Sequence, residues 1–149
     1  MKMVVMMLCL AAAVAGFAAN MQTRYRVGER LDVSQFEVEQ GKGHVVRVTN
    51  ARHGLVYYSC RTQVGNADVI VYVSLEGLVL GVSEEFAFAS AAEREAASAA
   101  IRAELRRRYA EQIARGEVVI MLNPDESGRR LEVYCLARSF AKVFGRVSA

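Results

Sequence analysis

The stretch DVIVYVSLEGLVLGV, residues 68–82, predicts the centre of the fold. It holds two β-branched, apolar runs separated by Glu76-Gly77, and a glycine can take the positive φ that a tight hairpin turn requires. Both runs are apolar on both faces, which is typical of central strands covered on each side or of strands at a subunit interface. The stretch therefore predicts a central hairpin, and it leaves open that the chain is one subunit of an oligomer.

From Ser90 onward the apolar residues recur at helical spacing instead of forming strand-like runs. Ser90 and Glu93 form the capping box S-x-x-E, in which each side chain binds a backbone amide of the first helical turn. Residues 91–115 are rich in Ala, Glu, Arg and Leu, and Gly116 supplies a stop, so one long helix is predicted there. Its apolar stripe recurs every four residues: Ala97, Ile101, Leu105, Tyr109 and Ile113. Two i, i+4 ion pairs are predicted on it: Glu104 with Arg108, and Glu111 with Arg115.

The other apolar runs predict a hairpin before the central one and another after the helix. HVVRVTN and LVYYSC flank ARHG, and EVVIMLN and RRLEVYCLA flank PDESG. Residues 24–43 alternate loosely and predict one edge strand or two short strands. A short closing helix is predicted from apolar residues at helical spacing: Phe140, Val143, Phe144 and Val147. The sequence therefore predicts an α+β fold, with an antiparallel sheet of about six or seven strands, one long helix (about 91–115) packed across one face, and a C-terminal hairpin.

The start of the chain has the pattern of a secretory signal peptide. A lysine gives a positive start, Val4–Val14 is an unbroken apolar run, and Gly16 and Ala18 stand at the −3 and −1 positions of a cleavage site. An uncleaved membrane anchor is the alternative, although the apolar run is short for a membrane helix. We therefore predict a signal peptide at residues 1–18 and a single secreted domain at residues 19–149, in the extracellular space or the periplasm.

Without the signal peptide the chain keeps two cysteines, Cys60 and Cys135. In an exported protein a small, even number of cysteines is typical of a disulfide. Buried thiols, a metal site and a catalytic cysteine are the alternatives, but the pair lacks the short C-x₂₋₄-C spacing of zinc sites. We predict a disulfide between Cys60 and Cys135 that joins an early strand to the last hairpin, and we predict no metal and no cofactor.

His44 and His53 are the only histidines, and imidazole groups titrate near neutral pH. If a hairpin brings them to one face near Arg47 and Arg52, the four supply the acid, the base and the guanidinium group that phosphodiester cleavage requires. The alternative is that both histidines are exposed at loop ends, because His44 follows Gly-Lys-Gly and His53 precedes a glycine. These four residues are the catalytic candidates.

Tyr57, Tyr58, Arg102 and Arg106 are the candidate binding residues. Adjacent tyrosines face opposite sides of a strand, so at least one of them is a candidate for the outside, and core packing is the alternative. Helical arginines can follow a nucleic-acid backbone, but consecutive helical residues point about 100° apart, which favours a solvated, ion-paired surface. The predicted partner is a protein, and nucleic acid is the weaker alternative because the net charge is only +3.

Tyr58-Ser59-Cys60, together with Cys135, resembles the Y-x-C motif and late cysteine of the small ribonuclease-like effectors that plant-pathogenic fungi secrete. That family also has a signal peptide and a similar size. Its helix follows the Y-x-C strand soon afterwards, whereas here two predicted strands come before Ser90. The motif covers three residues, and the resemblance implies the class of secreted effectors rather than membership of the family.

The sequence has no G-x-S-x-G, Walker, H-E-x-x-H or G-x-G-x-x-G motif. We therefore predict a secreted, disulfide-containing binding protein without its own catalysis: an effector, an inhibitor or an accessory factor. A small secreted ribonuclease-like hydrolase that uses His44 and His53 is the first alternative. A subunit of an exported oligomer is the second, and no membrane partner is predicted after signal cleavage.

Overall fold

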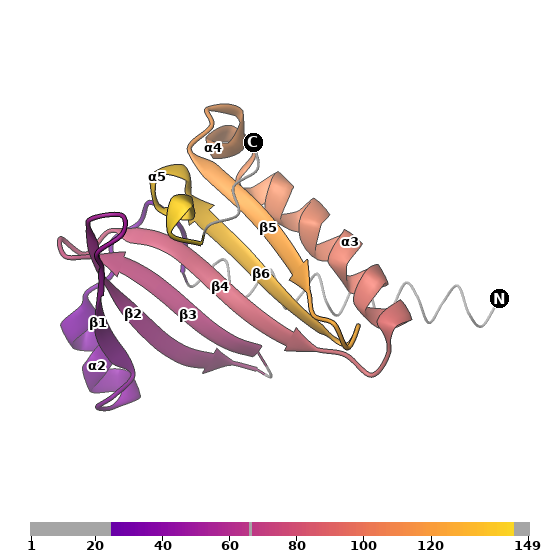
Figure 1. Cartoon of the computed structure of the whole chain (residues 1–149), viewed down its shortest axis with the longest axis horizontal. Coiled ribbons are helices and arrows are strands. Elements are labelled where there is room, and N and C mark those ends of the chain that lie inside the picture. Colours follow the sequence, from indigo (N-terminus) through magenta and orange to yellow (C-terminus); the bar gives the residue numbers. More distant parts are fainter. Residues whose placement is uncertain (1–24, 66, 145–149) are drawn as a thin grey trace.

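In the computed structural model, which describes residues 25–65 and 67–144, the apolar runs form strands and the Ala-, Glu- and Arg-rich run forms a helix (Figure 1). The strands are β1 (Val45–Asn50), β2 (Leu55–Val64), β3 (Ala67–Ser74), β4 (Val79–Ala87), β5 (Val118–Pro124) and β6 (Arg130–Ala137). The helices are α2 (Val33–Gln40), α3 (Ala91–Arg108), α4 (Ala110–Ala114), α5 (Arg138–Ala141) and the 3-10 helix η1 (Lys142–Phe144). The fold is α+β, as the sequence predicts.

The strands form a six-stranded antiparallel sheet in the order β1-β2-β3-β4-β6-β5. β3 and β4 are its central strands, so the prediction of a central hairpin at residues 68–82 is confirmed. The turn between them covers the four residues 75–78 rather than two, and Gly77 in that turn has a φ of +88°. After β4 the chain runs through α3 to β5, and β6 then returns between β4 and β5.

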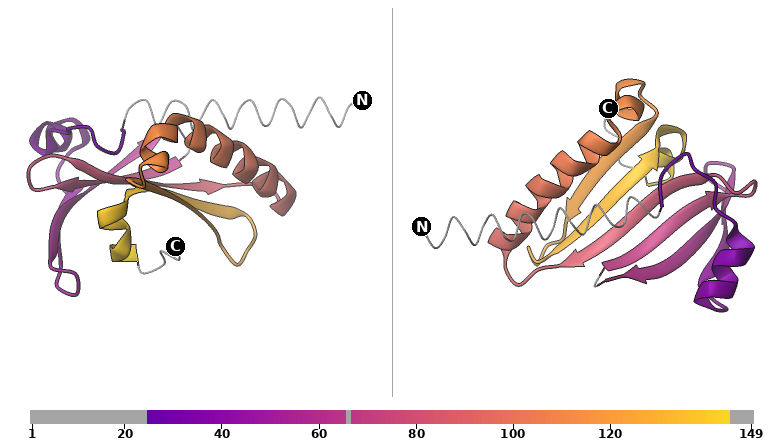
Figure 2. Two further views of the ribbon diagram at one scale, coloured as in Figure 1. Left: turned by 90° about the horizontal axis from the view of Figure 1, so that it is seen from above. Right: turned by 180° about the vertical axis from the view of Figure 1, so that it is seen from behind.

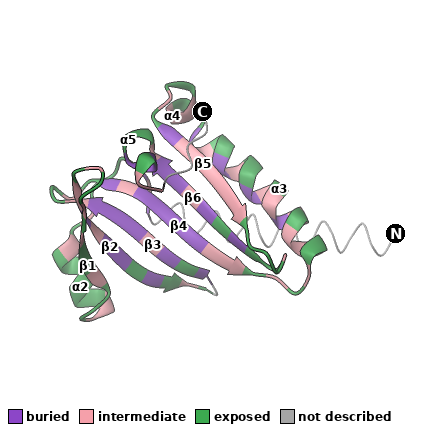
Figure 3. Cartoon of the chain, in the orientation of Figure 1, coloured by how far each residue is buried: buried purple, intermediate pink, exposed green. Residues whose placement is uncertain are grey.

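The sheet is curved, and its two faces carry different layers (Figure 2). On the outer, convex face, α2 packs against β1 and β2, and α3 packs against β5 and β6. On the inner, concave face lie α5 and η1, over an apolar cluster that includes Tyr57, Tyr72, Leu136 and Phe140. Burial is extensive along β3, β4 and β6, which lie between these layers (Figure 3).

The long helix begins as predicted but ends earlier. The Ser90 hydroxyl accepts a hydrogen bond from the Glu93 amide at 3.2 Å. α3 ends at Arg108 instead of residue 115, because Tyr109 leaves helical geometry (φ −101°, ψ 20°) and α4 follows as a separate short helix. The apolar stripe is confirmed by four buried side chains: Ala97, Ile101, Leu105 and Tyr109. The helix lies along the β5–β6 side of the sheet rather than across its middle (Figure 1).

Part of the segment that the sequence predicts as one or two strands is the helix α2. Asp32 caps it, because its Oδ1 accepts a hydrogen bond from the Gln35 amide at 3.1 Å. Phe36 faces the sheet and is 3% exposed, whereas Val38 is 84% exposed. The loose alternation of apolar residues was therefore misleading, and the cap at Asp32 was the local signal that indicated a helix.

The flanking hairpins β1–β2 and β5–β6 are confirmed. The closing helical segment is also present, as α5 and η1, with Phe140 buried against the concave face. Val147 of the predicted closing helix lies outside the described residues.

No disulfide joins Cys60 and Cys135, so the predicted bridge is wrong. Cys60 lies opposite Val71, Val71 opposite Val82, and Val82 opposite Cys135, so β3 and β4 separate the two cysteines. Three strand spacings put their Cα atoms about 14 Å apart, and a disulfide requires less than about 7 Å. Both side chains are 0% exposed and pack in the core of the convex face. The prediction of export therefore rests on residues 1–18, which lie outside the described residues.

Alanine substitutions test whether the two sulfur atoms are independent. We expect Cys60→Ala and Cys135→Ala each to lower the free energy of unfolding by about 0.5–3 kcal/mol, because each removes a buried group. The double variant should lose the sum of the two within about 0.5 kcal/mol, since the side chains are not in contact. Urea unfolding with and without a reductant measures these values. A wild-type stability that depends on the reductant, or a coupling above about 2 kcal/mol, would contradict the observed strand order.

Candidate binding groove

The structure does not bring the four catalytic candidates together. His44 lies directly before β1, whereas His53 lies in the β1–β2 turn, where its amide donates a hydrogen bond to Asn50 Oδ1 at 3.1 Å. The six residue-to-residue steps from His44 to Asn50 span about 20 Å, so the two imidazole groups occupy opposite ends of one hairpin. Arg47 is exposed on β1 and Arg52 is exposed in the turn. His44 and His53 are therefore too far apart to act as acid and base on the same phosphate group.

Tyr57 and Tyr58 point to opposite faces of β2, as adjacent strand residues must. Tyr57 is buried on the concave face, with its ring centroid 6.0 Å from that of Tyr72 and 4.9 Å from that of Phe140. Tyr58 is half-buried on the convex face and packs against the core there. Tyr57 is therefore a core residue, and only Tyr58 has a side chain that is partly accessible to a partner.

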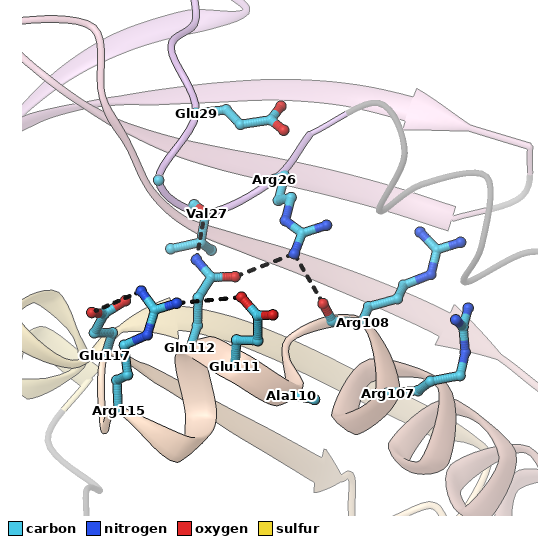
Figure 4. Close-up of a pocket in the computed structure, with 11 residues that line it drawn as sticks. Arg26, Val27, Glu29, Arg107, Arg108, Ala110, Glu111, Gln112, Arg115 and Glu117 are labelled. Carbon is cyan, nitrogen blue, oxygen red and sulfur yellow. Dashed lines mark hydrogen bonds and ion pairs between the residues drawn. The ribbon is translucent and has the colours of Figure 1, made fainter.

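A groove of about 660 Å³ lies between the chain that precedes α2 and the junction of α3 with α4 (Figure 4). Two hydrogen bonds connect its walls at Val27: its amide donates to the Tyr109 hydroxyl at 3.2 Å, and its carbonyl accepts from Gln112 Nε2 at 3.2 Å. Arg26 adds a third contact, from its Nη2 to Arg108 O at 2.9 Å. The Arg26 guanidinium also lies over the Tyr109 ring, 5.2 Å from its centroid. These contacts form the groove by holding two distant segments side by side.

One end of the groove is basic. Arg107 and Arg108 both pair with Glu104, each at 2.7 Å, and their hydrogen bonds lower the pKa of the Glu104 carboxyl to about 2. Arg26 donates to neutral acceptors, Arg108 O and Gln112 Oε1 (3.4 Å), and no described carboxylate lies within ion-pair distance of it. Among the described residues, this end therefore holds three guanidinium groups and only one paired carboxylate, Glu104, so its net charge is positive.

The other end of the groove is balanced by its own ion pairs. Arg115 lies between Glu111 (3.3 Å) and Glu117 (3.8 Å), and Glu29 lines the opposite wall of the groove (Figure 4). The pair of Glu111 with Arg115 and the pair of Glu104 with Arg108 confirm the two i, i+4 ion pairs that the sequence predicts. Charge along the groove therefore changes from positive to mixed.

Arg102 and Arg106, predicted as binding residues, are exposed on α3. They are one helical turn apart, and neither pairs with a described carboxylate within 4.0 Å. Consecutive helical residues point about 100° apart, so Arg106 projects from a different side of α3 than Arg107. The structure does not place Arg102 or Arg106 among the residues that line the groove.

Arg26 and Gln112 are groove residues that the sequence did not indicate. They are 86 positions apart, and neither belongs to a recognisable motif. The nearest local signal was Tyr109, a residue of the apolar stripe with a polar group that needs a partner when it is buried. That signal predicts a hydrogen bond but does not identify the segment that supplies it.

Among residues 25–65 and 67–144, no group of three or more His, Cys, Asp and Glu side chains is arranged to hold a metal ion. Within the same residues, no helix has both the length and the apolar composition to cross a bilayer. Cys60 is poorly suited to nucleophilic catalysis, because burial raises the pKa of its thiol to about 11. Comparisons with protein-family models, curated proteins and solved structures found no match.

Glu84 is a buried carboxyl group near the centre of the sheet, and it is 4% exposed. Its cross-strand neighbours Val69 and Val133 are each 1% exposed. No hydrogen bond or ion pair joins its carboxyl group to another described residue, and desolvation raises its pKa to about 8. Glu84 is therefore mostly protonated at neutral pH, and its ionisation opposes folding.

Removal of one hydroxyl tests the contact that connects the groove walls. We expect Tyr109→Phe to lower the free energy of unfolding by about 1–3 kcal/mol, because the buried Val27 amide loses its acceptor. Tyr134→Phe is the matched control, since it removes a hydroxyl that donates to the exposed Glu132 carboxylate. Its effect should be within about 0.5 kcal/mol. Equal effects of the two substitutions in urea unfolding would contradict the role assigned to Tyr109.

Glu84 predicts a pH dependence of stability. A glutamate in the unfolded chain has a pKa of about 4.3, so between about pH 4.5 and 8 the folded protein keeps a proton that the unfolded chain has lost. Stability should fall as the pH rises through this window, by at most about 1.4 kcal/mol per pH unit, and level off above it. In Glu84→Gln this slope should be absent, and the variant should be more stable than wild type at pH 8. Glu85→Gln, on the concave face of the same strand, should retain the wild-type slope; a Glu84→Gln slope equal to wild type would refute the assignment.

Proposed function

We propose that the protein acts by binding, without catalysis of its own, as an exported effector, inhibitor or accessory factor. Its binding site is the basic end of the groove, and Arg102 and Arg106 on α3 remain predicted binding residues outside it. The ligand is an acidic segment of a protein partner. The signal-like pattern of residues 1–18 supports export, and the charge distribution of the groove supports the ligand class.

Arg26 is the observation that carries the proposal. Its guanidinium is half-buried and is held by Arg108 O, by Gln112 Oε1 and by the ring of Tyr109, so its position is set before a ligand arrives. A ligand carboxylate at this guanidinium gains a charge-assisted hydrogen bond, which is roughly twice as strong as a neutral one. Because little side-chain freedom is left to lose, the entropic cost of this contact is low.

The carboxylates at the other end favour a protein over a nucleic acid. Glu29, Glu111 and Glu117 line the groove and repel a phosphate backbone that follows its length. A protein segment can place acidic side chains beside Arg26 and neutral or basic side chains beside Glu117. Mixed charge of this kind selects a partner with the complementary pattern.

The two alternatives have less support. The hydrolase alternative needs His44 and His53 on one substrate, and they lie at opposite ends of a hairpin. The oligomer alternative needs an apolar surface on residues 68–82, but there the exposed large apolar side chains are Leu75 (47%) and Leu78 (40%), both in the turn. Two side chains in one turn form a small patch compared with a stable interface.

Single charge removals test the groove. We expect Arg26→Gln and Arg107→Gln each to weaken binding of a fluorescent octaglutamate peptide by at least about fivefold, because each removes one guanidinium from the basic end. Arg107→Gln is the cleaner variant, since Arg107 has no part in the contacts that hold the walls together. Arg129→Gln is the matched control: it loses the same charge in the exposed β5–β6 turn, and its affinity should stay within about twofold of wild type. Fluorescence anisotropy at physiological salt measures the affinities.

Equal weakening in all three variants would mean that only the total charge matters, and it would contradict a site in the groove. RNA cleavage by the wild type that is lost in both His44→Ala and His53→Ala would support the hydrolase alternative instead. Circular dichroism melting of each variant separates a loss of binding from a loss of fold.

A further inference from the structure

We propose a second binding site on the concave face of the sheet, for a basic segment of a protein partner. The site is a cavity of about 380 Å³, called here the concave cavity, between the β5–β6 hairpin and η1. Its lining residues are Met121, Asn123, Pro124, Asp125, Glu132, Tyr134 and Phe144. It lies on the face of the sheet opposite α3 and shares no residue with the groove, so it does not depend on the proposed function.

Two aromatic rings form one wall of the concave cavity. The rings of Tyr134 and Phe144 have centroids 5.2 Å apart at an interplanar angle of 52°. Phe144 is in turn fixed by contacts with Tyr72 (5.3 Å) and Phe140 (5.6 Å) in the cluster beneath α5. These contacts fix the position of the two rings, and an aromatic ring attracts a cation that lies over its face within about 6 Å.

Among the described residues, the carboxylates of the concave cavity have no cationic partner in its lining. The described lining holds Asp125 and Glu132 and no basic side chain. Glu132 accepts a hydrogen bond from the Tyr134 hydroxyl at 2.9 Å, and Asp125 accepts from the Ser127 hydroxyl and the Arg130 amide. The contacts of both carboxylates are with neutral donors, so the cavity combines negative charge with aromatic surface.

A smaller cavity of about 90 Å³ adjoins the first and shares Glu132 and Tyr134 with it. Asp68, Glu85 and Glu132 lie side by side in one row across β3, β4 and β6. Arg130 pairs with Glu85 at 2.9 Å, but it lines neither cavity. Like charges in directly opposed positions destabilise a sheet, so this row has a cost that a bound cation would relieve.

Aromatic rings beside carboxylates are the chemistry that recognises an ammonium or guanidinium group. The rings supply cation–π attraction, and the carboxylates supply charge-assisted hydrogen bonds. Two cavities on either side of Tyr134 favour a peptide with two basic side chains over a single small amine. About two strand spacings, or roughly 10 Å, separate positions over β5 from positions over β4. Residues two apart in an extended peptide point to the same side at a spacing of roughly 7 Å, and long basic side chains can spread over the remaining distance.

A fluorescent peptide with two arginines two positions apart, whose side chains point to the same side of an extended backbone, tests this site on the full chain. We expect Glu132→Gln to weaken its binding at least fivefold, because Glu132 borders both cavities. Glu95→Gln, which removes the same charge from the exposed surface of α3, should leave the affinity within twofold of wild type. Phe144→Leu should weaken binding while keeping an apolar side chain, and the same peptide with citrulline in place of arginine should bind at least fivefold more weakly than the arginine peptide.

Three results would overturn the proposal: no binding of the arginine peptide, equal affinity for the citrulline peptide, or equal loss in Glu132→Gln and Glu95→Gln. Light scattering adds a fourth, because a dimer of the wild type that dissociates in Glu132→Gln would mean that a second copy of the chain occupies this face. Arg107→Gln should leave this binding unchanged, which separates failure of the second site from failure of the groove.

Discussion

The insertion of β6 between β4 and β5 is the constraint on which the rest of the structure depends. β1 to β4 pair in sequence order, but the chain then leaves the sheet through α3 and returns one position farther out, at β5. Only the last strand closes the gap. Because α3 makes this crossover, its apolar stripe covers β5 and β6. Its C-terminal end then meets Arg26 and Val27, and the groove forms there.

The alternation of side chains along each strand gives the two faces different chemistry. β6 supplies Val133 and Cys135 to the core of the convex face, and Glu132 and Tyr134 to the concave face. The convex side therefore carries the helix and its arginines, while the concave side carries aromatic rings and carboxylates. The basic end of the groove and the acidic concave cavity therefore lie on opposite faces of the sheet, and the two proposed ligands carry opposite charges.

Local patterns accounted for most elements of the fold. The cap at Ser90, the apolar stripe of α3 and the β-branched runs of β3 and β4 depend on neighbours a few positions away, so they could be predicted from the sequence. Helix α2 was missed although its cap at Asp32 was visible, because loose alternation was given more weight than the cap. The end of α3 at Arg108 was missed because the partner of Tyr109 lies 82 positions away.

The sequence by itself determined the class of fold, the central hairpin, the long helix and the ion pairs along it, because short-range backbone geometry and side-chain spacing decide these features. Only the tertiary structure decided that Cys60 and Cys135 are three strands apart, that His44 and His53 lie at opposite ends of a hairpin, and that Arg26 joins the groove. These three outcomes depend on strand order and register, and distance along a chain carries little information about either.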